Sequence, residues 1–211
     1  MEIDPQRLSP TASYKLLIGC IVPRPIAWVS TVGLDGVHNL APFSFFMGVC
    51  GDPPTLAFSV GPRSTTAPGT ARVKDTVRNL EAAGDFVVNV VDDALARQMN
   101  LTSGEYPPEV DEFAVAGLTP APSARVRAPR VLEAPISLEC RLTQILPVGR
   151  GPNSLVLGEI VYFQVRDDLY DASTGRIDMQ RLHPVGRLAG ELYTHVHGLF
   201  EMKRPDPNYA G

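Results

Sequence analysis

Short runs of apolar residues, either continuous or alternating with polar ones, dominate the chain and predict strands. Turn sequences rich in Gly, Asp and Asn separate them, as at residues 33–36 and 149–153. The nearly continuous apolar run at 85–91 is typical of a strand that is buried on both faces. The expected strands cover residues 26–32, 37–47, 55–60, 85–91, 136–146, 155–165 and 193–202.

Helical signals are few and short. Residues 76–83 predict a helix, with Asp75 as its N-cap and Gly84 as its C-terminal stop. Asp92 or Asp93 is expected to cap a second helix that ends near residue 101. These helices are too few to alternate with the strands, which argues against a doubly wound parallel sheet.

The remaining segments predict loops and surface cover. Residues 61–72 are rich in Pro, Ser, Thr and Gly and predict a loop, and residues 103–134 show no sustained period, with helical or extended cover expected at 105–115. Residues 1–13 are polar, and we expect them on the surface or against a partner subunit. We therefore predict a mainly β fold with short helices (α+β), a closed or nearly closed, Greek-key-like antiparallel barrel.

Composition and charge fit one globular domain over residues 1–211, with its core at about 14–205. The net charge of −4 argues against a general nucleic-acid-binding protein. The sequence has neither an apolar run of 18 residues nor the pattern of a signal peptide at its start, so we expect a cytoplasmic protein without a membrane partner.

The cysteines Cys20, Cys50 and Cys140 are widely spaced and odd in number, which fits neither a disulfide framework nor a zinc site. Each has apolar neighbours, so all three are expected to be buried and structural.

Two segments indicate a phosphorylated aromatic ligand. Lys74 and Thr76 stand at a predicted helix start, where a cation, a hydroxyl and free backbone N–H groups can hold a phosphate. Residues 44–47 offer aromatic walls and backbone hydrogen bonds of the kind that a flavin ring needs. The alternatives remain open, because a capped helix with a solvated lysine and an ordinary aromatic core would leave the same pattern.

The chain resembles the flavin reductase-like family, which includes the flavoredoxins and has the FMN-binding split-barrel fold. The resemblance implies a homodimer with FMN near the subunit interface and electron transfer from NADH, NADPH or another donor. Two departures are the long loop at 64–73 and Met47, where the family often has a polar residue such as Asn. The motifs that carry the resemblance are 23–31 (PRPIAWVST), 39–46 (NLAPFSFF), 74–76 (KDT), 85–89 (DFVVN) and 185–193 (VGRLAGELY).

Candidate site residues lie within these motifs and in the segments near them. His183 and Arg187 are expected to meet the nicotinamide or another substrate, although a loop that merely packs on the barrel is the alternative. Gly61 is included because a missing Cβ lets the backbone approach a ligand. The candidates for binding the cofactor are Arg24, Asn39, Ser44, Phe45, Phe46, Met47, Ser59, Gly61, Arg63, Lys74 and Thr76.

No catalytic acid or base is expected, because the flavin itself supplies the chemistry. His195 and His197 lie on one face of a predicted strand, but a metal needs at least one more ligand. Since no Cys or carboxylate is close to them in sequence, we predict no metal site.

The leading hypothesis is an NAD(P)H-dependent flavin reductase that passes electrons through FMN to an acceptor, such as a partner oxygenase. The first alternative is a flavoredoxin-like electron carrier that serves a partner enzyme without using NAD(P)H. The second is a binding module that has kept the barrel and lost the flavin.

Overall fold

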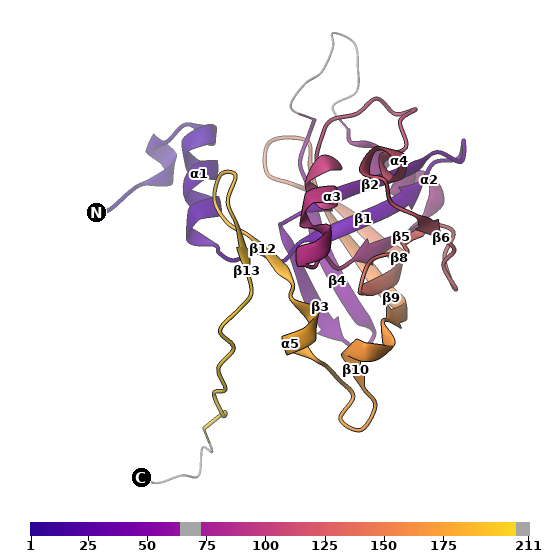
Figure 1. Cartoon of the computed structure of the whole chain (residues 1–211). Coiled ribbons are helices and arrows are strands. Elements are labelled where there is room, and N and C mark those ends of the chain that lie inside the picture. The colour runs from indigo at the N-terminus through magenta and orange to yellow at the C-terminus, as the bar shows by residue number, and fades with distance from the viewer. Residues whose placement is uncertain (64–72, 206–211) are drawn as a thin grey trace.

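The computed structural model describes residues 1–63 and 73–205 (Figure 1). Its helical segments are short, and half of them lie between strands of the main sheet in the sequence. They are η1 (Pro5–Arg7), α1 (Pro10–Cys20), α2 (Asp75–Ala83), η2 (Asp93–Leu95), α3 (Ala96–Leu101), α4 (Glu112–Ala116), η3 (Asp167–Leu169) and α5 (Met179–Leu182).

A seven-stranded sheet forms the body of the molecule, and each neighbouring pair in it is antiparallel. Its strand order is β2-β1-β5-β8-β9-β4-β3. The strands are β1 (Ala27–Val32), β2 (His38–Phe43), β3 (Phe46–Gly51), β4 (Pro54–Val60), β5 (Asp85–Asn89), β8 (Ile136–Val148) and β9 (Asn153–Val165).

Three two-stranded pairs complete the strand set. They are β6 (Pro120–Ala121) with β7 (Arg130–Val131), β10 (Tyr170–Asp171) with β11 (Arg176–Ile177), and β12 (Val185–Arg187) with β13 (Tyr193–His195).

The sheet curls around an aromatic core without closing. Four strands separate β2 from β4 in the strand order, yet the rings of Phe43 on β2 and Phe58 on β4 lie 5.3 Å apart. Phe86 on β5 meets Phe58 edge-on at 5.5 Å, so one cluster fills the interior. The end strands β2 and β3 are not paired with each other in the described part of the chain. The barrel is therefore split, as the resemblance implied, and not fully closed.

Glycine is required where β9 passes the core. A Cβ on Gly158 would lie 2.4 Å from Cζ of Phe86, whose ring is fully buried. The small residue thus lets an aromatic side chain fill the interior at normal packing density.

Short helices cover a second apolar cluster on the other side of β1. The Trp28 side chain is fully buried there, and its indole N–H donates to the Thr102 hydroxyl at 2.9 Å. Met99 of α3 and Phe113 of α4 belong to the same cluster, and so does Val185 of β12. This layer explains why residues 103–134 fold without a strong period: they follow the surface of the barrel.

The predictions for the central strands are confirmed, but two of the expected strands are wrong in extent. The expected strand at 37–47 divides at Ser44 into β2 and β3, because the chain crosses from one end of the sheet to the other. The expected strand at 193–202 is regular only over Tyr193–His195. Its partner β12 lies in a segment that was predicted to be a loop.

Two predictions for helix starts are resolved. Asp92 caps η2 by accepting from the Leu95 N–H, which settles the choice between Asp92 and Asp93. Lys74 occupies the N-cap position of α2, so the expectation that Asp75 is the cap is wrong. Asp75 lies in the first turn, where its carboxylate pairs with Arg63 and Arg78.

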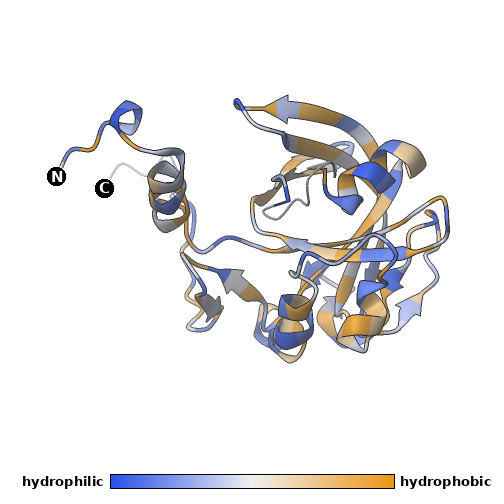
Figure 2. Ribbon diagram, turned by 90° about the horizontal axis from the view of Figure 1, so that it is seen from above, coloured by the Kyte–Doolittle hydropathy of each residue, from blue (hydrophilic) through white to orange (hydrophobic). Residues whose placement is uncertain are grey.

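Helix α1 was not predicted. Its local signals are Ser9, which accepts from the Ala12 N–H, and Pro10 at the first helical position. Figures 1 and 2 show α1 standing apart from the barrel, at the end of an extended segment. Since mostly polar residues precede it and only Ile18 is buried, hydrophobic periodicity gave no indication of it.

The Arg24 guanidinium fastens α1 to the rest of the chain. It donates to the carbonyl oxygens of Ile18 at 2.7 Å, Ile21 at 2.8 Å and Leu188 at 2.9 Å. Arg24 is only 5% exposed, so it is a buried arginine. Burial lowers its pKa.

The cysteine prediction is correct only for Cys140, which is buried, whereas Cys20 and Cys50 are exposed. Their apolar neighbours lie on α1 and on the end strand β3, two elements that expose apolar side chains on their surface. No helix among residues 1–63 and 73–205 is long and apolar enough to cross a membrane.

Candidate functional site

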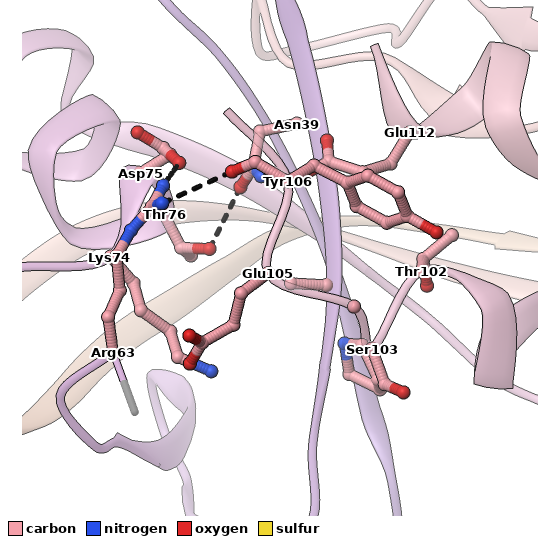
Figure 3. Close-up of a pocket in the computed structure, with 13 residues that line it drawn as sticks. Asn39, Arg63, Lys74, Asp75, Thr76, Thr102, Ser103, Glu105, Tyr106 and Glu112 are labelled. Atoms are coloured by element: carbon pink, nitrogen blue, oxygen red, sulfur yellow. Dashed lines mark hydrogen bonds and ion pairs between the residues drawn. The ribbon is translucent and has the colours of Figure 1, made fainter. Parts of the chain in front are cut away.

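A small pocket opens where α2 meets β2 and the segment after α3 (Figure 3). Its volume is about 40 Å³, room for only a few water molecules or for one small ionic group. We call it the Lys74 pocket. It is lined by Asn39, Ala41, Pro42, Arg63, Lys74, Asp75, Thr76, Thr102, Ser103, Gly104, Glu105, Tyr106 and Glu112.

The first turn of α2 forms one wall of the Lys74 pocket. In the described part of the chain no side chain caps this helix, whereas Ser9 caps α1. The first hydrogen bonds to the Lys74 carbonyl come from Val77 and Arg78, so the earlier N–H groups of the turn have no intrahelical partner. Such an end, with its partial positive charge, favours an anion.

Two basic residues, Arg63 and Lys74, and three acidic ones, Asp75, Glu105 and Glu112, line this pocket. Arg63 donates to the Asp75 carboxylate and, at 3.1 Å, to the Tyr106 carbonyl oxygen. Figure 3 shows Lys74 reaching toward Glu105. Burial lowers the pKa of the Lys74 ammonium, and the Glu105 carboxylate opposes that shift. The pocket therefore holds its charges partly out of water.

Polar side chains below the pocket form a hydrogen-bonded floor. The Thr76 hydroxyl donates to the Asn39 side-chain oxygen at 2.8 Å, and the Asn39 amide donates to Glu112 at 3.0 Å. The Leu40 N–H donates to the other Glu112 oxygen at 3.1 Å. Burial raises the pKa of Glu112 to about 7, although these hydrogen bonds favour its charged form.

A wide cleft adjoins the Lys74 pocket. Its volume is about 1280 Å³, and Pro42 and Ser103 line both spaces, so the two lie next to each other. We call it the Arg187 cleft. Its lining residues come from α1, the segment before β1, β2 and its end, α3, and the β12–β13 hairpin: Thr11, Tyr14, Lys15, Ile18, Arg24, Ile26, Pro42, Ser44, Ala96, Arg97, Met99, Asn100, Ser103, Arg187, Ala189, Gly190, Glu191 and Tyr193.

Two arginines meet in this cleft through backbone pairing. The Arg24 and Arg187 N–H groups each donate to the other residue's carbonyl oxygen, at 2.9 and 2.8 Å. The Arg187 guanidinium lies over the Tyr193 ring, 4.3 Å from its centroid. The Tyr193 hydroxyl lies 3.2 Å from the Asn100 side-chain oxygen, which joins the hairpin to α3.

The structure brings together seven of the predicted site residues. The Lys74 pocket contains four of the cofactor candidates: Asn39, Arg63, Lys74 and Thr76. The Arg187 cleft contains Arg24, Ser44 and Arg187. The Arg24 Nε atom donates to the Ser44 hydroxyl at 3.4 Å, so this arginine acts mainly within the chain.

The other candidates line neither space. Phe45 lies beside the cleft, its ring 6.4 Å from that of Tyr14 and 5.7 Å from the Arg24 guanidinium carbon. Phe46 packs against the aromatic core, whereas Met47, on the end strand β3, is 58% exposed. Their roles toward a ligand stay predictions. Ser59, Gly61 and His183 also lie outside both spaces.

Several lining residues were missed by sequence reasoning. Ser103, Glu105, Tyr106 and Glu112 come from the segment that showed no period, and the fold alone brings them beside Lys74. The Asp111 cap of α4 was the one local signal in that region, since its carboxylate accepts from the Phe113 N–H at 2.8 Å. The long loop noted before the lysine motif falls largely at residues 64–72, outside the described residues.

Comparison with known proteins identifies the family of the chain. A family model for the flavin reductase like domain matches residues 18–181. The chain belongs to the flavin reductase-like family. The match includes β1 to β11 and both sides of the Lys74 pocket, whereas β12 and β13 follow it.

Solved structures extend the similarity to nearly the whole chain. Nitrilotriacetate monooxygenase component B from Bacillus cereus is 36% identical, with a TM-score of 0.89 over 96% of this chain and 98% of that one. The 2-nitrobenzoate 2-nitroreductase NbaA of Pseudomonas fluorescens is 31% identical, with a TM-score of 0.87 over 97% and 96%.

The fold has the expected split-barrel form. A split-barrel domain protein from Shewanella frigidimarina shares it at 22% identity, with a TM-score of 0.83 over 97% of this chain and 100% of that one. The sequence-based prediction of the family and of the split barrel is therefore confirmed.

Proposed function

We propose that this protein is an FMN-dependent oxidoreductase that takes electrons from NADH or NADPH. The observation that carries the proposal is that the Lys74 pocket lies next to the Arg187 cleft, with Pro42 and Ser103 lining both. A small pocket for one charged group beside a wide, partly apolar cleft matches a phosphate at one end of a planar ring system. When bound, FMN supplies the hydride and electron chemistry.

The residues of the Lys74 pocket fit a phosphate. The N–H groups at the start of α2 have no intrahelical partner, and the Lys74 ammonium stands at the same turn. The Thr76 hydroxyl gives its proton to Asn39, so it helps to fix the wall of the pocket. Lys74 and the first turn of α2 would hold the phosphate, and Arg63 would position Asp75 away from it through their ion pair.

The charges of the Arg187 cleft support a dinucleotide substrate. Lys15, Arg24, Arg97 and Arg187 line it against one carboxylate, Glu191. A cleft lined by one sign of charge attracts ligands of the opposite sign, and NADH and NADPH carry two and about four negative charges. This excess of cations favours the reductase over an electron carrier that never binds a nicotinamide.

The acceptor of the electrons is proposed from the relatives. One similar structure is a component of a monooxygenase and another is a nitroreductase. Of these two kinds of acceptor, we propose the first: electrons pass through the flavin to a partner oxygenase. The competing possibility is that the protein itself reduces a nitroaromatic compound.

We also propose that the active form is a homodimer. Helix α1 stands apart from the barrel and exposes Tyr14, Leu17 and Ile21, and the C-terminal segment exposes Leu199 and Phe200. A second copy of the chain is the proposed cover for these apolar side chains. Sedimentation analysis should give twice the chain mass, and Leu17→Lys should shift the mass toward one chain. A wild-type protein of single-chain mass would contradict the dimer.

The first experiment is a visible spectrum of the purified protein, with FMN added where colour is absent, followed by anaerobic addition of NADH or NADPH. Flavin absorbance that bleaches with either nucleotide supports the reductase. Bound flavin that stays oxidised after either nucleotide is added would contradict the reductase and favour an electron carrier. A protein that takes up no FMN would overturn the proposal.

A further inference from the structure

Three of the four histidines of the chain gather at one surface point, away from both the Lys74 pocket and the Arg187 cleft. The His195 and His197 rings are stacked, with centroids 5.2 Å apart and planes 15° from parallel. The His183 ring meets His197 at 6.3 Å in an edge-on contact. Asp93, from the turn η2, completes the cluster.

A third metal ligand, which the sequence does not place beside His195 and His197, is supplied by a residue that lies close to them in the folded chain. No carboxylate lies within three residues of His195 or His197 in the sequence, but the Asp93 carboxylate lies 2.7 Å from Nδ1 of His195. One ligand atom each from Asp93, His195 and His197 can be chosen so that all three lie within 4.8 Å of one another. Ligands of a tetrahedral zinc stand about 3.3 Å apart, given bond lengths of about 2.0–2.1 Å.

Backbone hydrogen bonds hold the contributing segments in register. The Asp93 N–H donates to the His183 carbonyl at 3.1 Å, and the Val185 N–H donates to Val91 at 3.1 Å. Val185 also pairs with His195 across the β12–β13 hairpin. Because the main chain fixes both sides, the three side chains need only rotate to share an ion.

We propose that Asp93, His195 and His197 form a binding site for a divalent transition metal, with zinc as the preferred ion. Two imidazoles and one carboxylate suit zinc and its neighbours, and not calcium or magnesium, which prefer oxygen ligands. The ion would take the place of the contact between His195 Nδ1 and the Asp93 carboxylate. All three side chains are exposed, so solvent supplies the remaining position.

The proposed ion links the β12–β13 hairpin to η2. The same hairpin carries Arg187 and Tyr193 into the Arg187 cleft, so the ion would brace one wall of that cleft from outside. This inference goes beyond the proposed function and does not depend on it, because metal binding is measured without flavin or nicotinamide.

The test uses full-length protein without a histidine tag, freed of metal with EDTA. Zn²⁺ affinity is measured by competition with a chromogenic chelator, and Co²⁺ binding by visible absorption. We expect one ion per chain, and an affinity at least about 10-fold weaker in Asp93→Asn, His195→Ala and His197→Ala, since loss of even an outer partner costs about 10- to 100-fold.

His38→Ala is the matched control, because His38 forms a similar pair with Asp111 at 3.3 Å but lies outside the cluster. Its affinity should equal that of the wild type. Wild-type binding no tighter than that of His195→Ala, or an equal loss in His38→Ala, would overturn the site.

Proton NMR of the wild type gives a second readout that needs no variant. Zn²⁺ should shift the imidazole signals of His195 and His197 and leave those of His38 in place; shifts confined to other histidines would also overturn it.

Discussion

The Asn39 side-chain amide donates to the Glu112 carboxylate at 3.0 Å and so joins two residues 73 positions apart. This bond anchors α4 to β2 directly beneath the Lys74 pocket. Through its side-chain oxygen, Asn39 also accepts from Thr76 at 2.8 Å, so a single amide connects the buried acid to the first turn of α2.

Glu112 should make stability depend on pH. Burial raises its pKa from 4.5 to about 7 in the folded protein, so the folded state binds this proton more tightly than the unfolded state. Stability from Glu112 is therefore greatest below about pH 4.5 and is lost as the pH rises to about 7, by on the order of 3 kcal/mol. Urea unfolding of Glu112→Gln between pH 5 and 8 should lack this loss. Parallel pH curves for the two proteins would contradict the prediction.

Lys74→Ala should weaken FMN binding by about 10- to 100-fold, because a hydrogen bond to a charged group contributes about 1.5–3 kcal/mol. Riboflavin, which lacks the phosphate, should bind wild type and variant alike. Arg181→Ala is the control and should bind FMN as the wild type does, since Arg181 is an exposed cation of α5 that lines neither the Lys74 pocket nor the Arg187 cleft. Fluorescence titration measures both ligands, and equal losses for FMN and riboflavin would contradict the role of Lys74.

Thr102→Val should destabilise the fold by about 1–3 kcal/mol, because it leaves the buried Trp28 indole N–H without its acceptor. Thr119→Val, at an exposed position, should change the free energy of unfolding by less than about 0.5 kcal/mol. Urea unfolding followed by tryptophan fluorescence measures both, since Trp28 is the only tryptophan in the chain. A Thr102→Val protein as stable as the control would contradict the assigned hydrogen bond.

Two thiols per chain should react with a thiol reagent in the native protein, and three after unfolding. Cys20 and Cys50 are exposed, whereas Cys140 is fully buried and its burial raises the pKa of its thiol. Mass spectrometry after brief labelling identifies the positions. In the dimer proposed above, Cys20 on α1 should react more slowly than Cys50 if the partner covers that helix.

Sequence patterns predicted the parts of the fold in which local signals and tertiary packing agree. The apolar run of β5 forms an interior strand of the sheet, between β1 and β8, and the alternating runs of β8 and β9 form its longest pair. The pattern could not show that the strand expected at 37–47 leaves one end of the sheet at Ser44 and starts again at the other. That division depends on the curvature of the whole barrel.

The site was predictable where a motif carries its own chemistry and not where the fold assembles it. Lys74 and Thr76 stand together in sequence and remain together in the pocket. Glu112 belongs to none of the recognised sequence motifs and reaches Asn39 only through the packing of α4. Asp93 likewise meets His195 only because β12 pairs with β13.

The split between β2 and β3 has a consequence for the rate of folding. Only Ser44 and Phe45 separate these strands in the chain, yet they cannot form a hairpin, because each pairs with a different end of the sheet. The sheet joins these two ends only through β8, which comes from the second half of the chain and pairs with β5. We therefore expect the sheet to curl around the aromatic core only after β8 has paired with β5. Chains dominated by such distant contacts fold in about milliseconds to seconds, and this barrel should refold at the slow end of that range.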